Sequence, residues 1–460
     1  MPVFPAKSAT IAVSAGHSGA DWFDRTCADH YAARPPSVQP GFFMSINACG
    51  IDFGTSNTTA AVSDAAGARL LPLEEGRLTL PSAVFFNVEE NTMAYGRAAL
   101  QEYLDGYEGR LMRSMKSLLG SSLMDTGTDV GGRHLAFRDL IGSFIGEVKR
   151  RAETQVQSDF DSVVVGRPVR FVDDDSEADR LAQDTLAQIV RGLGFRDVSF
   201  QFEPIAAAHA FEQTISREAL TLVVDIGGGT SDFSLVRLSP DRRGAADRSV
   251  DLLGNSGVHI GGTDFDKRLS LACVMPELGM GTLMQSGAIV PNTTYFQLAT
   301  WHTIHLTYHR SVLTGLQDML LDVADPHRFG RLLRVVRERK GHQIAMRSEA
   351  AKIELSDLES CLFDLDVAEA GLQVAMTRDQ FEAAIAAEIE RVCAAAQRCL
   401  DHAGVRADTL DTLFFTGGSS AVPALREALS RRFPLARPVE GDLYGSVGCG
   451  LAVVAGHRYG

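Results

Sequence analysis

Residues 221–238 read TLVVDIGGGTSDFSLVRL, and this stretch decides the fold. An apolar run ends at Asp225, three glycines follow, and a second apolar run begins after Asp232. This pattern predicts a strand, a glycine turn and a second strand. Because glycine tolerates positive φ and close approach, such a turn can present several N–H groups to a phosphate. Asp225 would repel a phosphate that it touched, so its place predicts a divalent cation that bridges the two.

A second copy of this unit lies 173 residues earlier. It reads DFGTSNT from Asp52 to Thr58, with an apolar stretch on either side. Two copies, each leading one half of the chain, predict two similar lobes that face each other across a cleft. Their turns would hold a di- or triphosphate from both sides, with Mg²⁺ between them. Two ordinary β-hairpins with glycine at the turn are the alternative interpretation of the same pattern.

Strand and helix patterns alternate along the chain, which predicts an α/β fold. The runs 47–53, 161–169 and 411–420 are apolar and end in turn residues, as buried strands do. A helix is predicted to begin at Ser176, taken as its N-cap, and to close at Gly194. Another is predicted to open with a capping box at Thr377 and to stop at Gly404.

The composition excludes some classes of partner. The chain has 460 residues, of which 45% are hydrophobic, and a formal net charge of −14. This acidic balance argues against nucleic acid or a membrane surface as partner, because both attract basic faces. No apolar run is long enough for a transmembrane helix, and the N-terminus is a poor signal peptide. The seven cysteines are scattered without a CxxC pair, which favours a cytoplasmic location.

Two further segments carry polar groups that a nucleotide site could use. Glu203 precedes Pro204, a residue that suits the first turn of a helix. A carboxylate there is either a general base or cation-water ligand in the cleft, or a plain helix-start residue stabilised by the dipole. Residues 416–420 form a glycine turn after a strand, which could pass under a flat ligand. The P-loop pattern GxxxxGK[ST] is absent, so the phosphate site is of another type.

These four elements, in this order, resemble the nucleotide-binding domain of the DnaK-type heat-shock chaperones, within the actin–hexokinase ATPase superfamily. The segments that carry the resemblance are 50–57, 202–208, 223–234, 260–269, 347–356 and 414–420. GRPV, GFRDVSFQFEP and LLGNSGVHIGG are most similar to the short YegD-like branch, which lacks a substrate-binding domain. The resemblance implies a two-lobed actin-like ATPase fold with a duplicated βββαβα core and a central nucleotide cleft.

The corresponding domain organisation has three parts. Residues 1–43 are rich in proline and lack periodicity, so they are predicted to be a poorly ordered extension. Residues 44–219 would form the first lobe, with the first phosphate motif. Residues 220–460 would form the second lobe, with the second phosphate motif, an inserted subdomain at about 265–405, and the adenosine motif.

The resemblance implies ATP and Mg²⁺ as ligands and phosphoryl transfer to water as the reaction. Asp52, Asp225 and Glu203 would surround the metal, mostly through water. Glu203, Asp225 and Thr230 would be the catalytic residues. The residues that would bind the nucleotide are Gly54, Thr55, Ser56, Gly227, Gly228, Gly229, Thr230, Glu349, Lys352, Ser356, Gly417, Gly418 and Ser419.

The chain departs from the family at the position of the catalytic lysine. Leu100 stands where that lysine belongs. Without its charge, we expect a basal turnover at least ~100-fold below a typical kinase rate of about 1–100 s⁻¹. The alternative is that Lys116 or Arg113 reaches the same place from a neighbouring element.

Two other departures concern the nucleobase and the end of the chain. Ile353 and Ala421 stand where the family has the arginines that hold adenine, so a looser or apolar contact to the base is expected. The sequence ends ten residues after Gly450, so a peptide-binding half is not expected.

Three functions remain open at this point. The first is a chaperone-related ATP-binding protein with slow or partner-stimulated hydrolysis, whose partners would be ATP or ADP and a protein client or co-chaperone. The second is a non-catalytic scaffold or filament protein that uses nucleotide as a switch. The third is a small-molecule kinase, for which Asp161 is the candidate base.

Overall fold

The computed structural model describes residues 47–172, 175–243, 245, 248–443 and 445–460. These residues all belong to one compact unit, 46–460. The predicted extension 1–43 lies outside the described residues, and the predicted lobe boundaries remain predictions. None of the helices in the described ranges combines the length and the apolar character needed to cross a membrane.

The first half of the unit is built on a six-stranded sheet with the order β11-β10-β1-β2-β3, in which β4 also pairs with β2. Strand β1 lies at its centre, antiparallel to β2 and parallel to β10. Both faces of β1 and β10 are buried, which explains their continuous apolar runs. The strands are β1 (Ala48–Phe53), β2 (Asn57–Asp64), β3 (Gly67–Leu70), β4 (Leu80–Pro81), β10 (Ser162–Arg167) and β11 (Asp197–Phe202).

The second half repeats this plan in a five-stranded sheet with the order β14-β13-β12-β17-β18. Its central strand β12 is antiparallel to β13 and parallel to β17, as β1 is to β2 and β10. The strands are β12 (Ala219–Ile226), β13 (Ser231–Leu238), β14 (Leu252–Val258), β17 (Thr412–Thr416) and β18 (Arg437–Glu440). The predicted α/β fold with a duplicated core is therefore confirmed.

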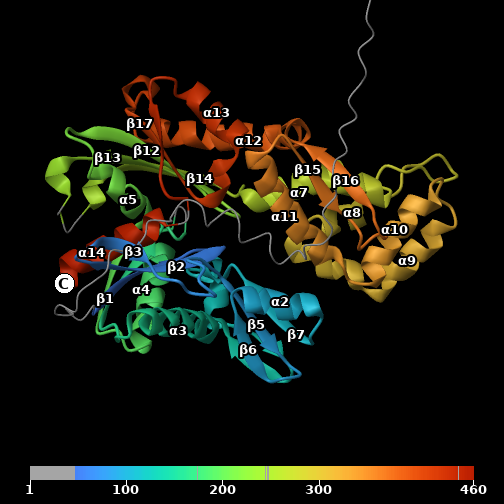
Figure 1. Cartoon of the computed structure of the whole chain (residues 1–460), viewed down its shortest axis with the longest axis horizontal. Helices are drawn as coiled ribbons and strands as arrows, with labels where there is room; N and C mark the ends of the chain where they lie inside the picture. Colours follow the sequence, from blue (N-terminus) through green and yellow to red (C-terminus); the bar gives the residue numbers. More distant parts are fainter. Residues whose placement is uncertain (1–46, 173–174, 244, 246–247, 444) are drawn as a thin grey trace, which may run out of the picture. The chain divides into compact units, whose positions relative to one another are not determined.

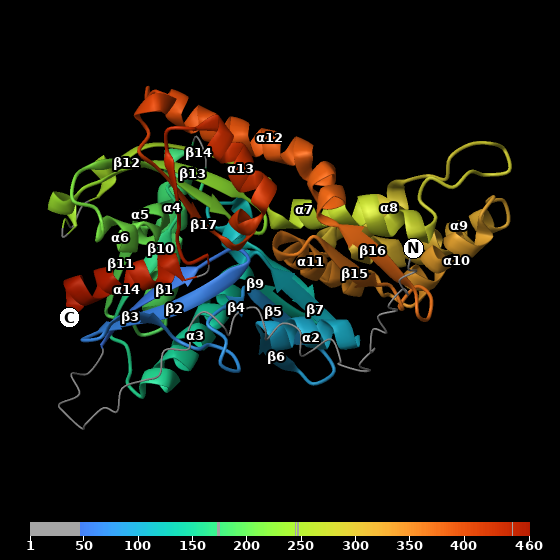
Figure 2. The same cartoon turned by 45° about the horizontal axis from the view of Figure 1, so that its top comes forward.

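Two helices pack where the two sheets approach each other. The C-terminal helix α14 (Ser446–Tyr459) contacts β1, β2 and β10 as well as α5 (Glu203–Ala207) (Figure 2). One apolar cluster joins Val164 of the first sheet, Val223 of the second sheet, Ala206 of α5 and Leu451 of α14. The helix crossing is tight, because a β-carbon built on Gly450 would lie 2.0 Å from the Ala206 carbonyl oxygen.

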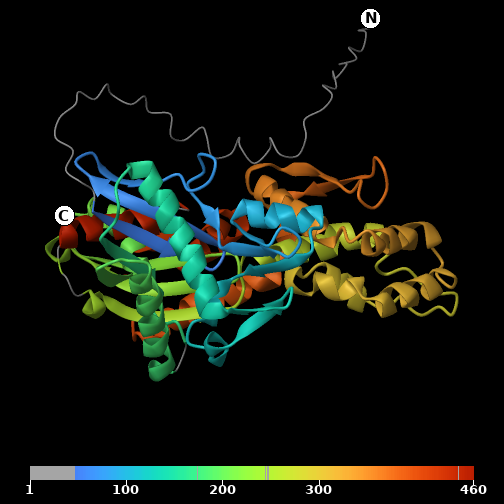
Figure 3. The same cartoon turned by 90° about the horizontal axis from the view of Figure 1, so that it is seen from below.

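The outer faces of the sheets are covered by other helices. Helices α3 (Phe137–Val156) and α4 (Ser176–Gly192) pack on the first sheet, and Figure 3 shows α3 running across its strands. Helix α12 (Arg378–His402) packs on β13 and β14. The predicted capping box at Thr377 is confirmed. The predicted N-cap Ser176 is wrong by one residue, because the Asp175 carboxylate accepts the N–H groups of Glu177 and Ala178.

The remaining elements form smaller groups around the two sheets (Figure 1). In the first half, β5 pairs with β6 and β7 beside α2, and β8 pairs with β9. In the second half, β15 pairs with β16. Their bounds are β5 (Ala83–Asn87), β6 (Thr92–Tyr95), α2 (Arg97–Asp105), β7 (Gly109–Arg113), β8 (Gly127–Val130), β9 (Arg133–Ala136), α6 (His209–Glu212), α7 (Gly262–Leu269), α8 (Thr293–Leu298), α9 (Arg310–Leu320), α10 (Pro326–Arg337), α11 (Gly341–Asp357), β15 (Ser360–Asp364), β16 (Gln373–Thr377) and α13 (Pro423–Arg432).

Candidate functional site

The two predicted turns have the same register. In the first hairpin Asp52 pairs with Thr59, and in the second Asp225 pairs with Asp232. Each aspartate therefore stands at the end of the central strand of its sheet, one residue before the last ladder pair. The matching positions follow from equal spacing, since six residues lie between the paired positions in both hairpins.

The two turns meet. A β-carbon built on Gly228 would lie 2.3 Å from the Ser56 side-chain oxygen and 3.2 Å from its Cβ. Of the two properties of glycine that the sequence suggested, positive φ is not used here, because none of Gly227, Gly228 and Gly229 has positive φ. The opposite turn approaches Gly228 closely, so its missing β-carbon makes room for the Ser56 side chain.

The start of α7 braces the second turn from behind. The N–H of Gly262 donates to the Gly227 carbonyl at 3.0 Å, and the N–H of Thr263 donates to the Gly228 carbonyl at 2.7 Å. A β-carbon on Gly261 would lie 2.6 to 2.7 Å from backbone atoms of Gly228 and Gly229. The position of the turn is therefore fixed by backbone contacts with the segment IGGTDFDKRL.

Ser82 braces the first turn in a similar way. Its hydroxyl donates to the Gly54 carbonyl at 2.7 Å, and its N–H donates to the Ser56 carbonyl at 2.9 Å. In the second turn the Thr230 hydroxyl donates to the Asp232 carboxylate at 2.8 Å. Thr55 and Thr230 are both partly exposed.

The predicted carboxylate Glu203 is the first residue of α5, with Pro204 in the first turn. Its Oε1 atom lies 2.6 Å from the Nζ atom of Lys116, and the two side chains are 15% and 10% exposed. Glu203 also lies against Gly166 at the end of β10, where a β-carbon would be 3.2 Å from its Cγ. The carboxylate thus lies among the strand ends of the first sheet and is paired with a lysine.

The carboxylates and Lys116 act on one another electrostatically. Burial, followed by the negative charge of Glu203, raises the pKa of Asp52 to about 7, while Lys116 opposes this. Burial also raises the pKa of Asp225 to about 8, with Asp232 as the next cause. The charges of Glu203 and Lys116 affect Asp225 as well. The structure therefore brings the three predicted carboxylates into one group around Lys116.

This group has the charge that a divalent cation requires. Three carboxylates face a single lysine, and the pKa values of Asp52 and Asp225 are raised first by burial and then by the negative charge of neighbouring carboxylates. Across the described parts of the chain, no three His, Cys, Asp or Glu side chains come together closely enough to hold a metal by themselves. The residues fit a cation whose remaining ligands are water and phosphate oxygens, as Mg²⁺ prefers.

Lys116 is the residue whose place sequence reasoning could not fix. It lies in a short 3₁₀ segment, Met115–Leu118, that follows a left-handed residue, Ser114. Leu100, at the position expected for the lysine, packs instead against an apolar cluster that includes Phe85 and Ala99. No local pattern could have placed Lys116, because its partner Glu203 lies 87 residues away.

On the predicted nucleoside side, Lys352 is paired and Glu349 is exposed. The Lys352 Nζ atom lies 2.9 Å from the Asp266 carboxylate and 3.3 Å from the Gly262 carbonyl. Burial raises the pKa of Asp266 to about 7, which Lys352 opposes. Ser356 donates its hydroxyl back to the Lys352 carbonyl at 3.0 Å. Asp266 lies within the segment IGGTDFDKRL, but sequence reasoning did not assign it a role.

The predicted adenosine turn touches the second phosphate turn. Gly417 has φ 78°, and a β-carbon there would lie 2.4 Å from the Asp225 carboxylate. Gly418 opens a short 3₁₀ segment, Gly418–Ala421, in which the Ser420 hydroxyl donates to the Gly417 carbonyl at 2.7 Å. Ser419 is buried close to Gly262, whose β-carbon would lie 2.3 Å from its hydroxyl. The elements predicted for phosphate and for adenosine are therefore adjacent.

A ring cluster joins the first half to the second beyond the carboxylates. The Tyr103 hydroxyl of α2 lies 3.3 Å from the His342 ring nitrogens at the start of α11. The guanidinium of Arg113 lies 4.5 Å from the ring centre of Trp301, whose ring is 4.9 Å from that of His342. Arg113 therefore packs on the Trp301 ring, whereas Lys116 pairs with Glu203 among the carboxylates.

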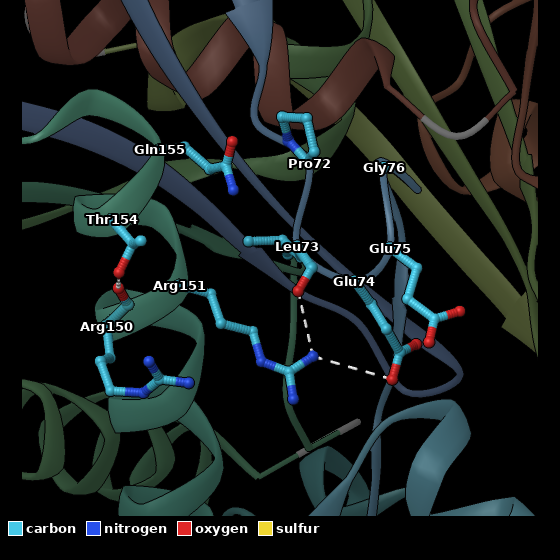
Figure 4. Close-up of a pocket in the computed structure, with 9 residues that line it drawn as sticks. All are labelled: Pro72, Leu73, Glu74, Glu75, Gly76, Arg150, Arg151, Thr154 and Gln155. Carbon is cyan, nitrogen blue, oxygen red and sulfur yellow. Dashed lines mark hydrogen bonds and ion pairs between the residues drawn. The ribbon is translucent and has the colours of Figure 1, made fainter.

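A separate surface pocket lies on the first half (Figure 4). It has a volume of about 120 Å³ and lies between the chain segment 72–76 and the last turns of α3. Arg151 crosses it, donating to the Leu73 carbonyl at 3.0 Å and lying 3.7 Å from the Glu74 carboxylate. None of the residues predicted to bind nucleotide lines this pocket.

Comparison with known proteins agrees with this geometry. A family model described as "Hsp70 protein" matches residues 48–275 and 336–457. Chaperone protein HscA of Serratia proteamaculans is 27% identical over 406 residues, which cover 84% of this chain and 54% of that protein. The HscA chaperones of Salmonella typhimurium and Yersinia enterocolitica are 28% and 27% identical, with the same coverage. The chain thus spans about half the length of the curated relatives that it matches.

Proposed function

The chain belongs to the Hsp70 family, and from this membership and the geometry of the two turns we propose that it binds Mg²⁺–ATP between its two halves. Hydrolysis of ATP to ADP and phosphate is slow, or is stimulated by a partner. The single observation that carries the proposal is the contact of Gly228 with Ser56, which brings two phosphate-type turns together. Two unrelated hairpins are not expected to pack their turns on each other with an aspartate at the matching position of each.

The groups near the turns suit the parts of the ligand. The N–H groups of Gly54, Thr55 and Ser56, and of Gly228 to Thr230, would hold phosphate oxygens. The N–H of Gly227 instead donates to the Thr230 carbonyl at 3.0 Å and closes the turn. Asp52 and Asp225, with Glu203, would hold Mg²⁺ mostly through its water shell. When bound, Mg²⁺ would neutralise phosphate charge and so make attack on phosphorus easier.

The adenosine part would lie beside the residues that adjoin the second turn. Gly417 and Gly418 would approach it by their backbone, with Ser419 beside them. Lys352 and Ser356 lie on one helix with Glu349 and would contact ribose or base. Ile353 and Ala421 carry no charge, so the base would be held by packing rather than between arginines.

The position of Asp161, the candidate base of the kinase alternative, does not support that function. Asp161 precedes the first residue of β10, which pairs in parallel with β1. It therefore lies at the opposite end of the strands from Asp52, and its N–H and carbonyl are bonded to the backbone of Asn47 and Arg196. Asp161 holds a strand end in place rather than facing the carboxylates.

The relatives suggest the wider role. They are described as chaperone proteins, so we infer that a protein client or co-chaperone is the partner that this site serves. We also propose a cytoplasmic location, because the seven cysteines are scattered without a CxxC pair.

Thermal unfolding and calorimetry of the full chain test nucleotide binding. We expect ATP with Mg²⁺ to raise the melting temperature, since a ligand at about 100 times its Kd stabilises the native state by about 2.7 kcal/mol. ATP with excess chelator should give a smaller shift. A folded sample that shows no shift and no binding heat at millimolar Mg²⁺–ATP would rule the proposal out.

A further inference from the structure

The position of Lys116 is fixed by the hydrogen bonds and the buried flanking residues of the short segment that carries it. Its segment is closed by the Ser117 N–H and hydroxyl, which donate to the Ser114 carbonyl at 3.1 and 2.7 Å. The flanking residues Met115 and Leu119 are buried in the core of the first half. The ammonium group thus extends from a fixed turn into the carboxylate group.

The charge of Lys116 acts on every predicted catalytic carboxylate. The Nζ atom of Lys116 lies 2.6 Å from the Glu203 carboxylate, and the charges of Asp52 and Asp225 also act on it. In turn it lowers the pKa of both Asp52 and Asp225. Arg113, the other cation considered for this place, lies over the Trp301 ring instead.

We infer that Lys116 contacts the terminal phosphate of the bound nucleoside triphosphate and supplies the charge that Leu100 cannot. This rests on the proposed function. A triphosphate that enters between the turns brings more negative charge than the Glu203 carboxylate offers. Lys116 therefore changes partner, from Glu203 to a terminal phosphate oxygen.

The change of partner also frees Glu203. During hydrolysis a water oxygen forms a bond to the terminal phosphorus while the bond from that phosphorus to the bridging oxygen breaks. The electron pair of the broken bond stays on the diphosphate. The proton of the attacking water passes to the Glu203 carboxylate, which Lys116 has left, and then to solvent. The ammonium stabilises the charge on the phosphate oxygens in the transition state.

The test compares Lys116→Met with a matched control, Lys149→Met. Lys149 is also a partly buried lysine of the first half, and its Nζ atom lies 2.9 Å from the Glu153 carboxylate. Calorimetry with Mg²⁺ measures the affinities for ATP and for ADP, and single-turnover assays measure hydrolysis. We expect Lys116→Met to weaken ATP binding at least about 10-fold relative to ADP binding. It should also slow single-turnover hydrolysis by about 100-fold.

Lys149→Met should change neither quantity, and Lys116→Arg should keep most of the preference for ATP. The double variant Lys116→Met/Glu203→Gln leaves no unpaired carboxylate at 203, and it should show the same loss of preference for ATP over ADP. An unchanged ATP-to-ADP affinity ratio in folded Lys116→Met protein would overturn the assignment. Failure of the proposed function looks different, because the unaltered protein would then bind neither nucleotide.

Discussion

Gly228 and Ser56 are in contact although they belong to different sheets and stand 172 residues apart. A β-carbon at 228 would lie 2.3 Å from the Ser56 hydroxyl oxygen. The two turns thus pack directly on each other at this point, and a side chain at 228 would require the Ser56 side chain to move. The behaviour of the site should therefore depend on groups that fix the turns and on the charges beside them.

Asp225→Asn should stabilise the folded protein while it weakens the effect of Mg²⁺ on ATP affinity. The native pKa of Asp225 is raised from 3.8 to about 8, so its ionised form is less favourable in the folded than in the unfolded chain. Its contribution to stability is therefore lost as pH rises from about 4 toward 8, and the variant should be more stable than the unaltered protein at pH 8. We expect a gain on the order of 2 kcal/mol without nucleotide.

With ATP, the same variant should lose most of the extra affinity that Mg²⁺ confers. Asp161→Asn is the control, since Asp161 lies at the other end of the strands and should leave ATP binding unchanged. Titration of ATP with and without Mg²⁺ measures the difference. Unchanged Mg²⁺ dependence in Asp225→Asn protein would show that Asp225 is not at the cation.

Gly261→Ala should weaken nucleotide binding through the second turn. The new β-carbon would lie 2.6 to 2.7 Å from backbone atoms of Gly228 and Gly229, which cannot yield as a flexible side chain would. The turn must move away, so we expect ATP affinity to fall about 10-fold or more, with a stability loss of about 1–3 kcal/mol. Gly315→Ala in α9 meets nothing within 4 Å, so it should leave ATP affinity unchanged and raise stability by up to about 1 kcal/mol through helix propensity. Equal ATP affinity for the two variants would contradict the bracing role of Gly261.

Gly450→Ala should destabilise the crossing of α14 with α5. Its β-carbon would lie 2.0 Å from the Ala206 carbonyl oxygen, so the helices must separate. We expect the free energy of unfolding in urea to fall by about 1–3 kcal/mol. Gly456→Ala in the same helix meets only Ser63 at 3.3 Å, and helix propensity should offset that contact. A similar stability for both variants would mean that the crossing tolerates a wider separation.

Protonation of His342 should lower the free energy of unfolding in mild acid. Burial is the main cause that lowers its pKa from 6.5 to about 4. A hydrogen bond to the Trp301 backbone opposes this, and the charges of His305 and Arg113 lower the pKa further. Because the unfolded chain binds the proton first, the contribution of His342 is complete above pH 6.5 and is lost as pH falls toward 4. The expected loss is about 3 kcal/mol.

Unfolding in urea at several pH values measures this contribution as a difference between variants, because the cleft carboxylates have the opposite trend. His342→Gln should show a flatter decline below pH 6.5 than the unaltered protein. His302→Gln, on the exposed side of the neighbouring segment, should show the same slope as the unaltered protein. Parallel curves for all three proteins would contradict the prediction.

Much of the fold could be predicted because its features are local. The strand, glycine turn and strand at 221–238 each have a pattern within a few residues, and so does the copy that begins at Asp52. The capping box at Thr377 was recognised for the same reason. The error at Ser176 was one residue, because Asp175 and Ser176 are both good caps and only the backbone path decides between them.

The site was predicted less completely because its contacts are distant in sequence. The carboxylates were found, since each follows a strand or opens a helix. The glycine turn was recognised, and of the two properties of glycine that could explain it, the structure uses close approach at Gly228 and not positive φ. The pairing of Lys352 with Asp266 was not foreseen, since the two residues lie on different helices.

The sequence by itself determined the alternation of strands and helices, the duplicated turn and the family, because these depend on residue types at fixed short spacings. The tertiary structure alone decided that the turns touch at Gly228 and Ser56 and that Lys116, not Arg113, joins Glu203. It also decided that Leu100 belongs to an apolar cluster. The physical reason is that electrostatic and van der Waals contacts act over a few ångströms in space, whatever the separation along the chain.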